Sequence, residues 1–176
     1  MNIERRVNLV HLFSEGGCSK PSLFLLRGVE DYMLQVYSNN ITVTVPEEGV
    51  VFIPFNNVSK DKGCDSNLLA PGTVQIQRQG VYDDHVNGSV SSSVAGDFVF
   101  QLYVNGVAQP ETLTRFTAVV GSYQNLSFED LITVPRGNSN CCYSSPTTVQ
   151  VGVYSLGDVT GDLTFANISQ LVTRMC

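Results

Sequence analysis

Residues 97–107 of the chain read Asp-Phe-Val-Phe-Gln-Leu-Tyr-Val-Asn-Gly-Val. Phenylalanine and leucine recur at every second position, which is the side-chain period of a strand with one buried face. Asn105-Gly106 follows at once and is a strong hairpin signal, because both residue types tolerate a positive φ. We therefore predict a strand over residues 97–104 that turns back on itself.

Similar stretches occur on both sides of this strand, each bounded by Gly, Pro or Asn. The further strands that we predict are residues 41–45, 50–55, 73–77, 81–94, 112–120, 123–134, 147–156 and 162–172. We interpret residues 38–40 as a turn and residues 56–67 as a polar surface loop. Residues 29–37 fit either an extended segment or a short helical turn. About nine or ten strands with no ordinary helix after residue 40 predict an all-β protein, a two-sheet sandwich or jelly roll.

The composition agrees with this class and excludes others. The formal net charge is −6, and charged residues make up 15% of the 176-residue chain, against about 25% in an average protein. A negative charge disfavours a nucleic-acid binder held by phosphate contacts. The apolar share of 43% is high enough for a folded core rather than disorder.

The sequence also carries no signal for membrane insertion. No apolar run approaches the roughly 20 residues that a membrane-spanning helix needs. The first residues, Met1–Asn8, carry charges without a following apolar stretch, so we expect no signal peptide. We therefore expect no membrane span.

The five cysteines, Cys18, Cys64, Cys141, Cys142 and Cys176, leave two interpretations open. Free cysteines pack readily in protein cores, and buried or partly buried thiols are the first interpretation. A disulfide among Cys64, Cys141, Cys142 and Cys176 is the alternative. Their spacing does not match the Cys-x-x-Cys pairs of a zinc site, so we expect no metal.

Candidate catalytic residues are few. The two histidines are His11 and His85, and only His85 has acids beside it, Asp83 and Asp84. No nucleophile elbow, phosphate-binding glycine loop or His-Glu-x-x-His motif is present. We interpret His85 as a strand or turn residue and expect neither an enzyme nor a bound cofactor.

Four further aspartates occur in turn-like contexts. Asp158 and Asp162 flank Val-Thr-Gly, and Asp61 and Asp65 lie in the predicted loop. Calcium needs six to eight oxygen ligands, and two aspartates in one turn supply too few. We interpret all four as turn formers.

The order of short motifs after residue 46 resembles the C1q/TNF-like jelly-roll family, in particular its compact bacteriophage and prophage-encoded members. The motifs are the strand at residues 50–55, Gly80-Val81-Tyr82, Val104-Asn105-Gly106-Val107, Pro135-Arg136-Gly137 and Leu163-Thr164-Phe165. The adjacent Cys141-Cys142 and the final Thr173-Arg174-Met175-Cys176 are also similar to prophage-encoded members. The resemblance implies two regions, an N-terminal arm over residues 1–45 and a jelly-roll domain over residues 46–176.

The resemblance also implies a homotrimer, in which one sheet faces a threefold axis. Candidate aromatics for that interface, or for the sandwich core, are Tyr82, Phe98, Phe100, Tyr103 and Phe165, with a core role favoured because a two-layer fold needs inward aromatics first.

No collagen-like stalk or signal-anchor precedes the jelly roll, which favours a module that docks directly on a large assembly. We therefore expect a structural virion protein of a tailed bacteriophage, a trimeric capsid decoration or head-fibre module. Residues 1–45, with four of the ten basic residues, would anchor it to the capsid or another virion protein. The alternative is a receptor- or glycan-binding tip or adhesin that contacts host-surface glycans.

Overall fold

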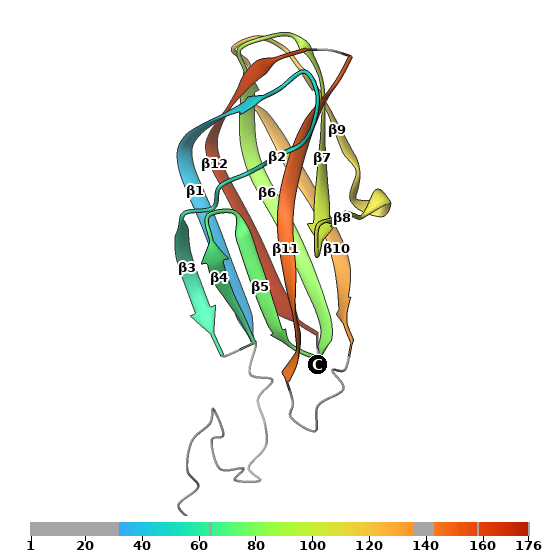
Figure 1. Ribbon diagram of the computed structural model, residues 1–176. Coiled ribbons are helices and arrows are strands. Elements are labelled where there is room, and N and C mark those ends of the chain that lie inside the picture. The colour runs from blue at the N-terminus through green and yellow to red at the C-terminus, as the bar shows by residue number, and fades with distance from the viewer. Residues whose placement is uncertain (1–31, 64, 136–142, 158, 176) are drawn as a thin grey trace, which may run out of the picture.

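The computed structural model describes residues 32–63, 65–135, 143–157 and 159–175. The described chain forms twelve strands and one single-turn 3₁₀ helix, η1, at Pro110–Thr112. The strands lie in two antiparallel sheets packed face to face (Figure 1). No helix in the described ranges is long and apolar enough to cross a membrane.

The first sheet has five strands in the order β10-β6-β12-β1-β3. Their bounds are β1 Met33–Val45, β3 Asn57–Lys62, β6 Gly80–Ser92, β10 Gln124–Val134 and β12 Gly161–Arg174. The first and last of these strands are neighbours, because β1 pairs with β12 from Met33 opposite Thr173 to Val45 opposite Gly161. The start of β1 and the end of β12 therefore lie at one end of the sandwich (Figure 1).

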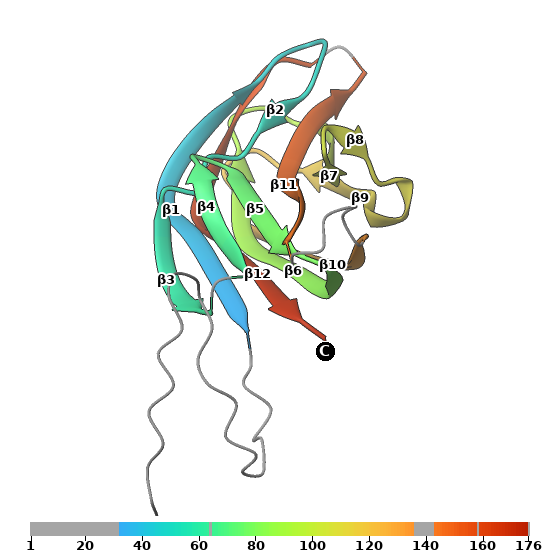
Figure 2. The same ribbon diagram turned by 60° about the horizontal axis from the view of Figure 1, so that its bottom comes forward.

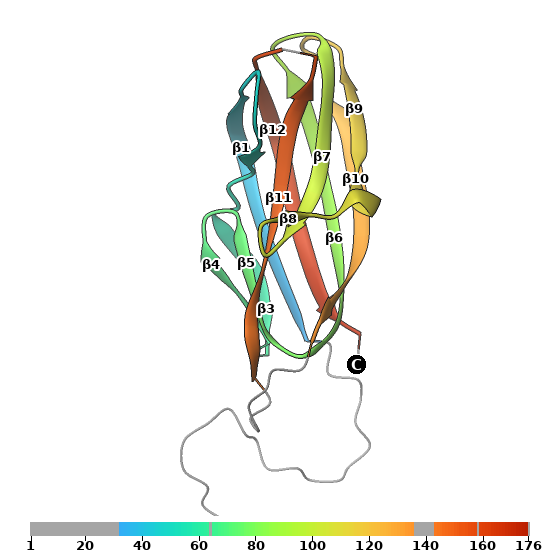
Figure 3. The same ribbon diagram turned by 45° about the vertical axis from the view of Figure 1, so that its right-hand side comes forward.

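The second sheet has seven strands. Its main order is β4-β5-β11-β7-β8, while β2 also pairs with β11 and β9 with β7. The bounds are β2 Val51–Phe52, β4 Ser66–Ala70, β5 Thr73–Arg78, β7 Gly96–Val104, β8 Val107–Ala108, β9 Thr114–Ala118 and β11 Tyr143–Leu156. In Figure 3, β7 and β11 lie side by side in front of β6 and β12. This architecture is the predicted jelly-roll β-sandwich of the C1q/TNF-like type.

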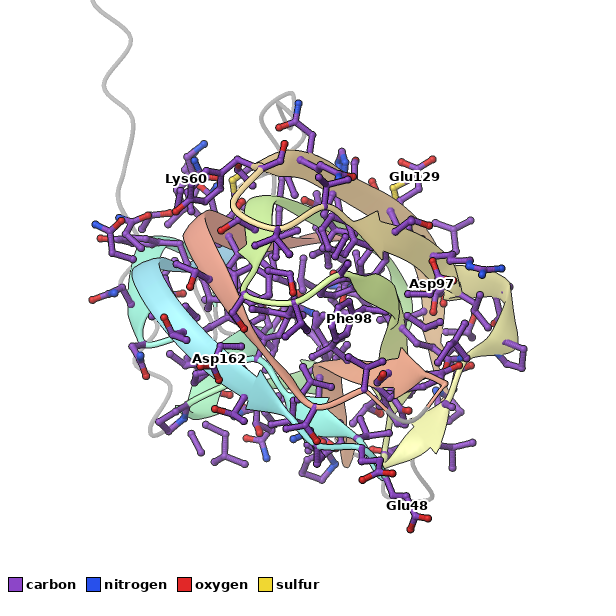
Figure 4. The ribbon with its side chains drawn as sticks, turned by 90° about the horizontal axis from the view of Figure 1, so that it is seen from above. Glu48, Lys60, Asp97, Phe98, Glu129 and Asp162 are labelled. Carbon is purple, nitrogen blue, oxygen red and sulfur yellow. The ribbon has the colours of Figure 1, made fainter. Side chains whose placement is uncertain are left out.

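The core lies between the two sheets and follows the alternation seen in the sequence. Phe98, Phe100 and Leu102 of β7 are fully buried and meet inward residues of the first sheet such as Phe165. Seen from above, Phe98 lies in the interior, whereas charged residues such as Glu129 lie around the periphery (Figure 4). The alternation in β7 therefore correctly identified its buried face.

The sequence interpretation was wrong for residues 33–45, which do not belong to a separate arm. They form β1, which lies between β12 and β3 in the first sheet. The strand is continuous through the predicted turn at residues 38–40, where Asn40 takes a positive φ of 52° without ending the pairing with β12. Residues 1–31 lie outside the described residues, so an anchoring role for them stays a prediction.

The predicted loop at residues 56–67 is also wrong, because it contains β3 and the start of β4. Every residue of β3 is exposed, so the strand shows no alternation in burial. Its strand conformation comes from backbone pairing with β1 at the border of the first sheet (Figure 2). Lys60 and Lys62 place charge on this border, which discourages pairing with another chain.

Two glycines with nearly equal positive φ allow a controlled test of a close approach. Gly72 has φ 75°, and a Cβ there would lie 2.4 Å from the backbone oxygen of Ile53, whereas Gly106 has φ 76° and no atom within 4 Å of a Cβ. Since both variants strain the backbone and only the first creates a clash, we expect Gly106→Ala to cost about 1 kcal/mol and Gly72→Ala about 2 kcal/mol. Urea unfolding measures both. Equal losses would show that the Ile53 carbonyl shifts without cost.

Candidate functional site

Only one of the two acids beside His85 lies on the same face of β6 as the histidine. On β6, Asp84 faces inward and is fully buried, whereas Asp83 and His85 are on the opposite, partly exposed face. Adjacent residues of a strand point to opposite sides of a sheet. His85 Nε2 instead lies 3.4 Å from Ser127 Oγ on β10. The structure therefore places Asp84 on the opposite face of β6 from His85, the residue that comes directly after it.

Asp84 has a different partner, Gln170 of β12. Both side chains are 0% exposed, and Gln170 Nε2 donates a hydrogen bond of 2.7 Å to Asp84 Oδ2. The other two oxygens, Asp84 Oδ1 and Gln170 Oε1, have no hydrogen-bond partner. Burial raises the pKa of Asp84 to about 7; the Gln170 hydrogen bond lowers it, and the charges of Asp130 and Asp83 raise it.

A second polar cluster joins the two sheets at the end where β12 finishes. The carboxylate of Asp65, just before β4, is 3.2 Å from Arg78 Nη1 and 3.1 Å from Arg174 Nη1. Arg174 Nη2 also donates to the carbonyl oxygen of Gln79 at 3.0 Å. Asp65 is 2% exposed, so its role is a buried inter-sheet contact rather than the turn former that we predicted.

Tyr82 lies beside this cluster. Its hydroxyl donates a hydrogen bond of 2.8 Å to the carbonyl oxygen of Arg78. Burial and the charge of Asp65 raise the pKa of Tyr82 to about 12, although the two arginines act in the opposite direction. A shallow pocket of about 410 Å³ adjoins the cluster and is bounded by residues that include Gly80, Thr133 and Arg174.

The outer face of the second sheet carries an aromatic surface. Phe52 of β2 and Tyr103 of β7 meet edge to face, with ring centroids 5.3 Å apart and an interplanar angle of 87°. A Cβ at Gly152 would lie 2.4 Å from Tyr103 Cε2, so the glycine leaves room for that ring over β11. Tyr103 and Tyr154 border a shallow pocket of about 330 Å³. Its lining residues are Gly49, Val50, Gln101, Tyr103, Tyr154 and Ser155, none of which is charged.

The structure divides the five predicted aromatics into two groups. Tyr82, Phe98, Phe100 and Phe165 are at most 1% exposed and belong to the sandwich core. Tyr103 is partly buried on the outer face instead. The four candidate disulfide cysteines, Cys64, Cys141, Cys142 and Cys176, lie outside the described residues, as does Cys18.

Several residues of these clusters were not identified from the sequence. The inward position of Asp84 was readable, because it alternates with Tyr82 and Val86 along one strand. Its partner was not, because Gln170 is 86 residues away. Among the described residues, no three His, Cys, Asp or Glu side chains group in a way that could hold a metal ion.

Comparisons with solved structures identify similar folds. The chain is similar to the PRD1 vertex protein P5, with 11% identity and a TM-score of 0.51 over 84% of this chain and 98% of that one. It is also similar to murine APRIL, with 9% identity and a TM-score of 0.50 over 81% and 99% of the two chains. The Eiger TNF of S. frugiperda is 9% identical at a TM-score of 0.48, over 82% and 93%. The similarities to P5 and APRIL establish the fold alone.

No protein-family model matches the sequence, and no curated protein matches it. The function therefore has to be argued from the fold and its surfaces.

Proposed function

We propose that the chain is a structural virion protein of a tailed bacteriophage, a trimeric capsid decoration or head-fibre module. The observation that carries the proposal is the structural overlap of 84% of this chain with nearly all of a PRD1 vertex protein. The surfaces support it, since Asp84 faces away from His85 and both pockets are shallow. The step from fold to function is one of analogy.

Anchoring is assigned to the residues that precede β1. The chain enters the sandwich at Met33, at the end where β12 also finishes. A segment docked on a capsid would hold this end against the particle, with the loops at residues 46–50 and 119–123 at the opposite end (Figure 1). The segment carries four basic and four acidic residues, and Arg5 and Arg6 place two adjacent positive charges in it that suit an acidic site on a capsid.

A trimer interface has to be built mostly from residues other than the five candidate aromatics. Four of the five candidate aromatics are already covered within one chain, so a threefold interface has to use exposed side chains. Leu131 on the outer face of the first sheet is 60% exposed and is one such residue. A cyclic trimer would present three anchoring segments to a symmetric site on a capsid.

We expect the full-length protein to sediment with a mass three times the 19.2 kDa of one chain. Analytical ultracentrifugation over a range of concentrations measures this mass. We also expect the trimer to co-sediment with capsids of the bacteriophage that encodes it. The double variant Arg5→Glu/Arg6→Glu should keep the mass of the trimer and bind those capsids less. A monomer that does not bind capsids would refute the proposal.

A second candidate function is binding of a receptor or glycan, which the uncharged aromatic pocket beside Tyr103 and Tyr154 favours. Tyrosine side chains offer an apolar ring and a polar hydroxyl, which suits a partner with both characters. Saturable binding to one sugar class on a glycan array, lost in Tyr154→Ala, would support this candidate. Equal binding by both proteins would remove it.

A further inference from the structure

The Asp84–Gln170 pair lacks one hydrogen-bond donor between its two unpaired oxygens. An ionised carboxylate only accepts hydrogen bonds, and the amide oxygen of glutamine also only accepts them. Asp84 Oδ1 and Gln170 Oε1 are both buried and both without a donor. A proton on Asp84 would supply that donor, and together with the bond from Gln170 Nε2 the pair would then form two complementary hydrogen bonds, amide to acid and acid to amide.

The surroundings also disfavour a charge on Asp84. A single hydrogen bond compensates poorly for taking a carboxylate out of water. Asp130 of β10 lies directly opposite Asp84 and also on the inward face of the sheet, where burial and the charge of Glu111 in η1 raise its pKa. Asp83 adds a further negative charge from β6 itself. Among the described residues, the ion pairs of Arg78, Arg115 and Arg174 go to other carboxylates.

The position of Asp130 connects the protonation of Asp84 to one strand. β10 is a border strand of the first sheet and, within the part of the chain that the structure describes, pairs only with β6. If Asp84 is ionised, two carboxylates face each other in the middle of that pairing, and like charges opposite each other destabilise a sheet. The neighbouring Leu126, Phe128 and Ile132 of β10 contribute to the core, so movement of β10 would expose apolar surface.

We propose that Asp84 is protonated in the folded protein, where it donates to Gln170, and that its ionisation releases the border strand β10. We call this arrangement of Asp84, Gln170 and Asp130 of β10 the pH-sensitive latch. The folded protein holds a proton that the unfolded chain, with an ordinary aspartate, gives up at lower pH. The contribution of Asp84 to stability is therefore complete below the ordinary aspartate pKa and is lost as the pH rises toward about 7, where Asp84 ionises in the folded state.

The first experiment measures the unfolding equilibrium of the full-length protein by urea titration from pH 5 to 8. As the pH increases toward 7, we expect the unfolding constant to rise by up to about tenfold per pH unit, which is the dependence for the release of one proton. Asp84→Asn keeps the shape and supplies an amide donor, so this rise should disappear. Asp83→Asn, the neighbouring outward acid, should keep it. The same pH dependence in all three proteins would overturn the proposal.

The second experiment follows the Asp84 carboxyl carbon and the β10 amides by NMR in the wild-type protein, so it does not depend on a variant that folds. We expect the carboxyl carbon to titrate near pH 7. Hydrogen exchange, corrected for its intrinsic pH dependence, should show β10 amides opening more often at pH 8 than at pH 6, while β5 amides in the other sheet change less. Titration at the ordinary aspartate pKa would refute the protonation, and equal change in β5 and β10 would refute the latch.

Discussion

Replacing Phe100 with alanine is expected to remove about 4 kcal/mol from the free energy of unfolding. Phe100 is 0% exposed and meets two other aromatic rings edge to face, Phe116 of β9 and Phe165 of β12, each with a centroid distance of 6.1 Å. The ring thus connects both sheets. Its loss removes buried apolar surface and leaves a cavity that a strand backbone cannot collapse to fill.

A matched control separates this effect from the general cost of losing a phenyl ring. Phe52 lies on the outer face, is 38% exposed and has Tyr103 as its aromatic contact. We expect Phe52→Ala to cost about 1 kcal/mol, since it loses part of one aromatic pair and little buried area. Chemical denaturation of both variants measures the difference. Similar losses would contradict the view that the inter-sheet aromatics dominate the core.

In thermal unfolding the same loss should lower the midpoint by about 8–16 °C for a chain of this size. A loss of about 4 kcal/mol is a large part of the roughly 5–15 kcal/mol by which ordinary domains are stable. The variant therefore also tests whether the proposed virion role depends on a rigid sandwich. We expect it to lose capsid binding at temperatures that the Phe52→Ala protein tolerates.

The strand pattern could be predicted where burial alternates and turn residues are specific. The hairpin at Asn105-Gly106 is confirmed, with Val104 paired to Val107 and positive φ at both turn residues. In contrast, β3 has no buried face, and its strand conformation depends on backbone pairing with β1. No local pattern of side chains carries that information, because the partner strand determines it.

The polar clusters were harder to predict than the strands for a related reason. Asp65 meets Arg174 across 109 residues of sequence. Short polar motifs predict turns from local propensity, so Asp65 was interpreted as a turn former rather than as part of an ion cluster. Alternation indicates which face a residue occupies, but the partner on that face depends on how the strands are ordered in the sheet.

The second large effect is expected at Asp65, whose replacement by alanine should lower the free energy of unfolding by about 3 kcal/mol. Its side chain is 3% exposed and forms ion pairs with both Arg78 and Arg174, whose side chains are 37% and 20% exposed. Without the carboxylate, two positive charges remain close together at a partly dry site between the sheets. Their partial exposure keeps the loss at the lower end of the range for buried pairs.

The exposed pair of Asp97 and Arg115 provides the matched control, because it has the same chemistry on a solvated surface. Asp97→Ala should change the unfolding midpoint much less, since water replaces the lost contact at Arg115. Asp65→Asn keeps the size of the side chain and one acceptor oxygen, so its loss should fall between that of Asp65→Ala and the wild-type protein. Urea unfolding ranks the three variants. If Asp97→Ala were as damaging as Asp65→Ala, the cost would not come from desolvated charge, and the cluster would not be what holds β12 to the second sheet at this end.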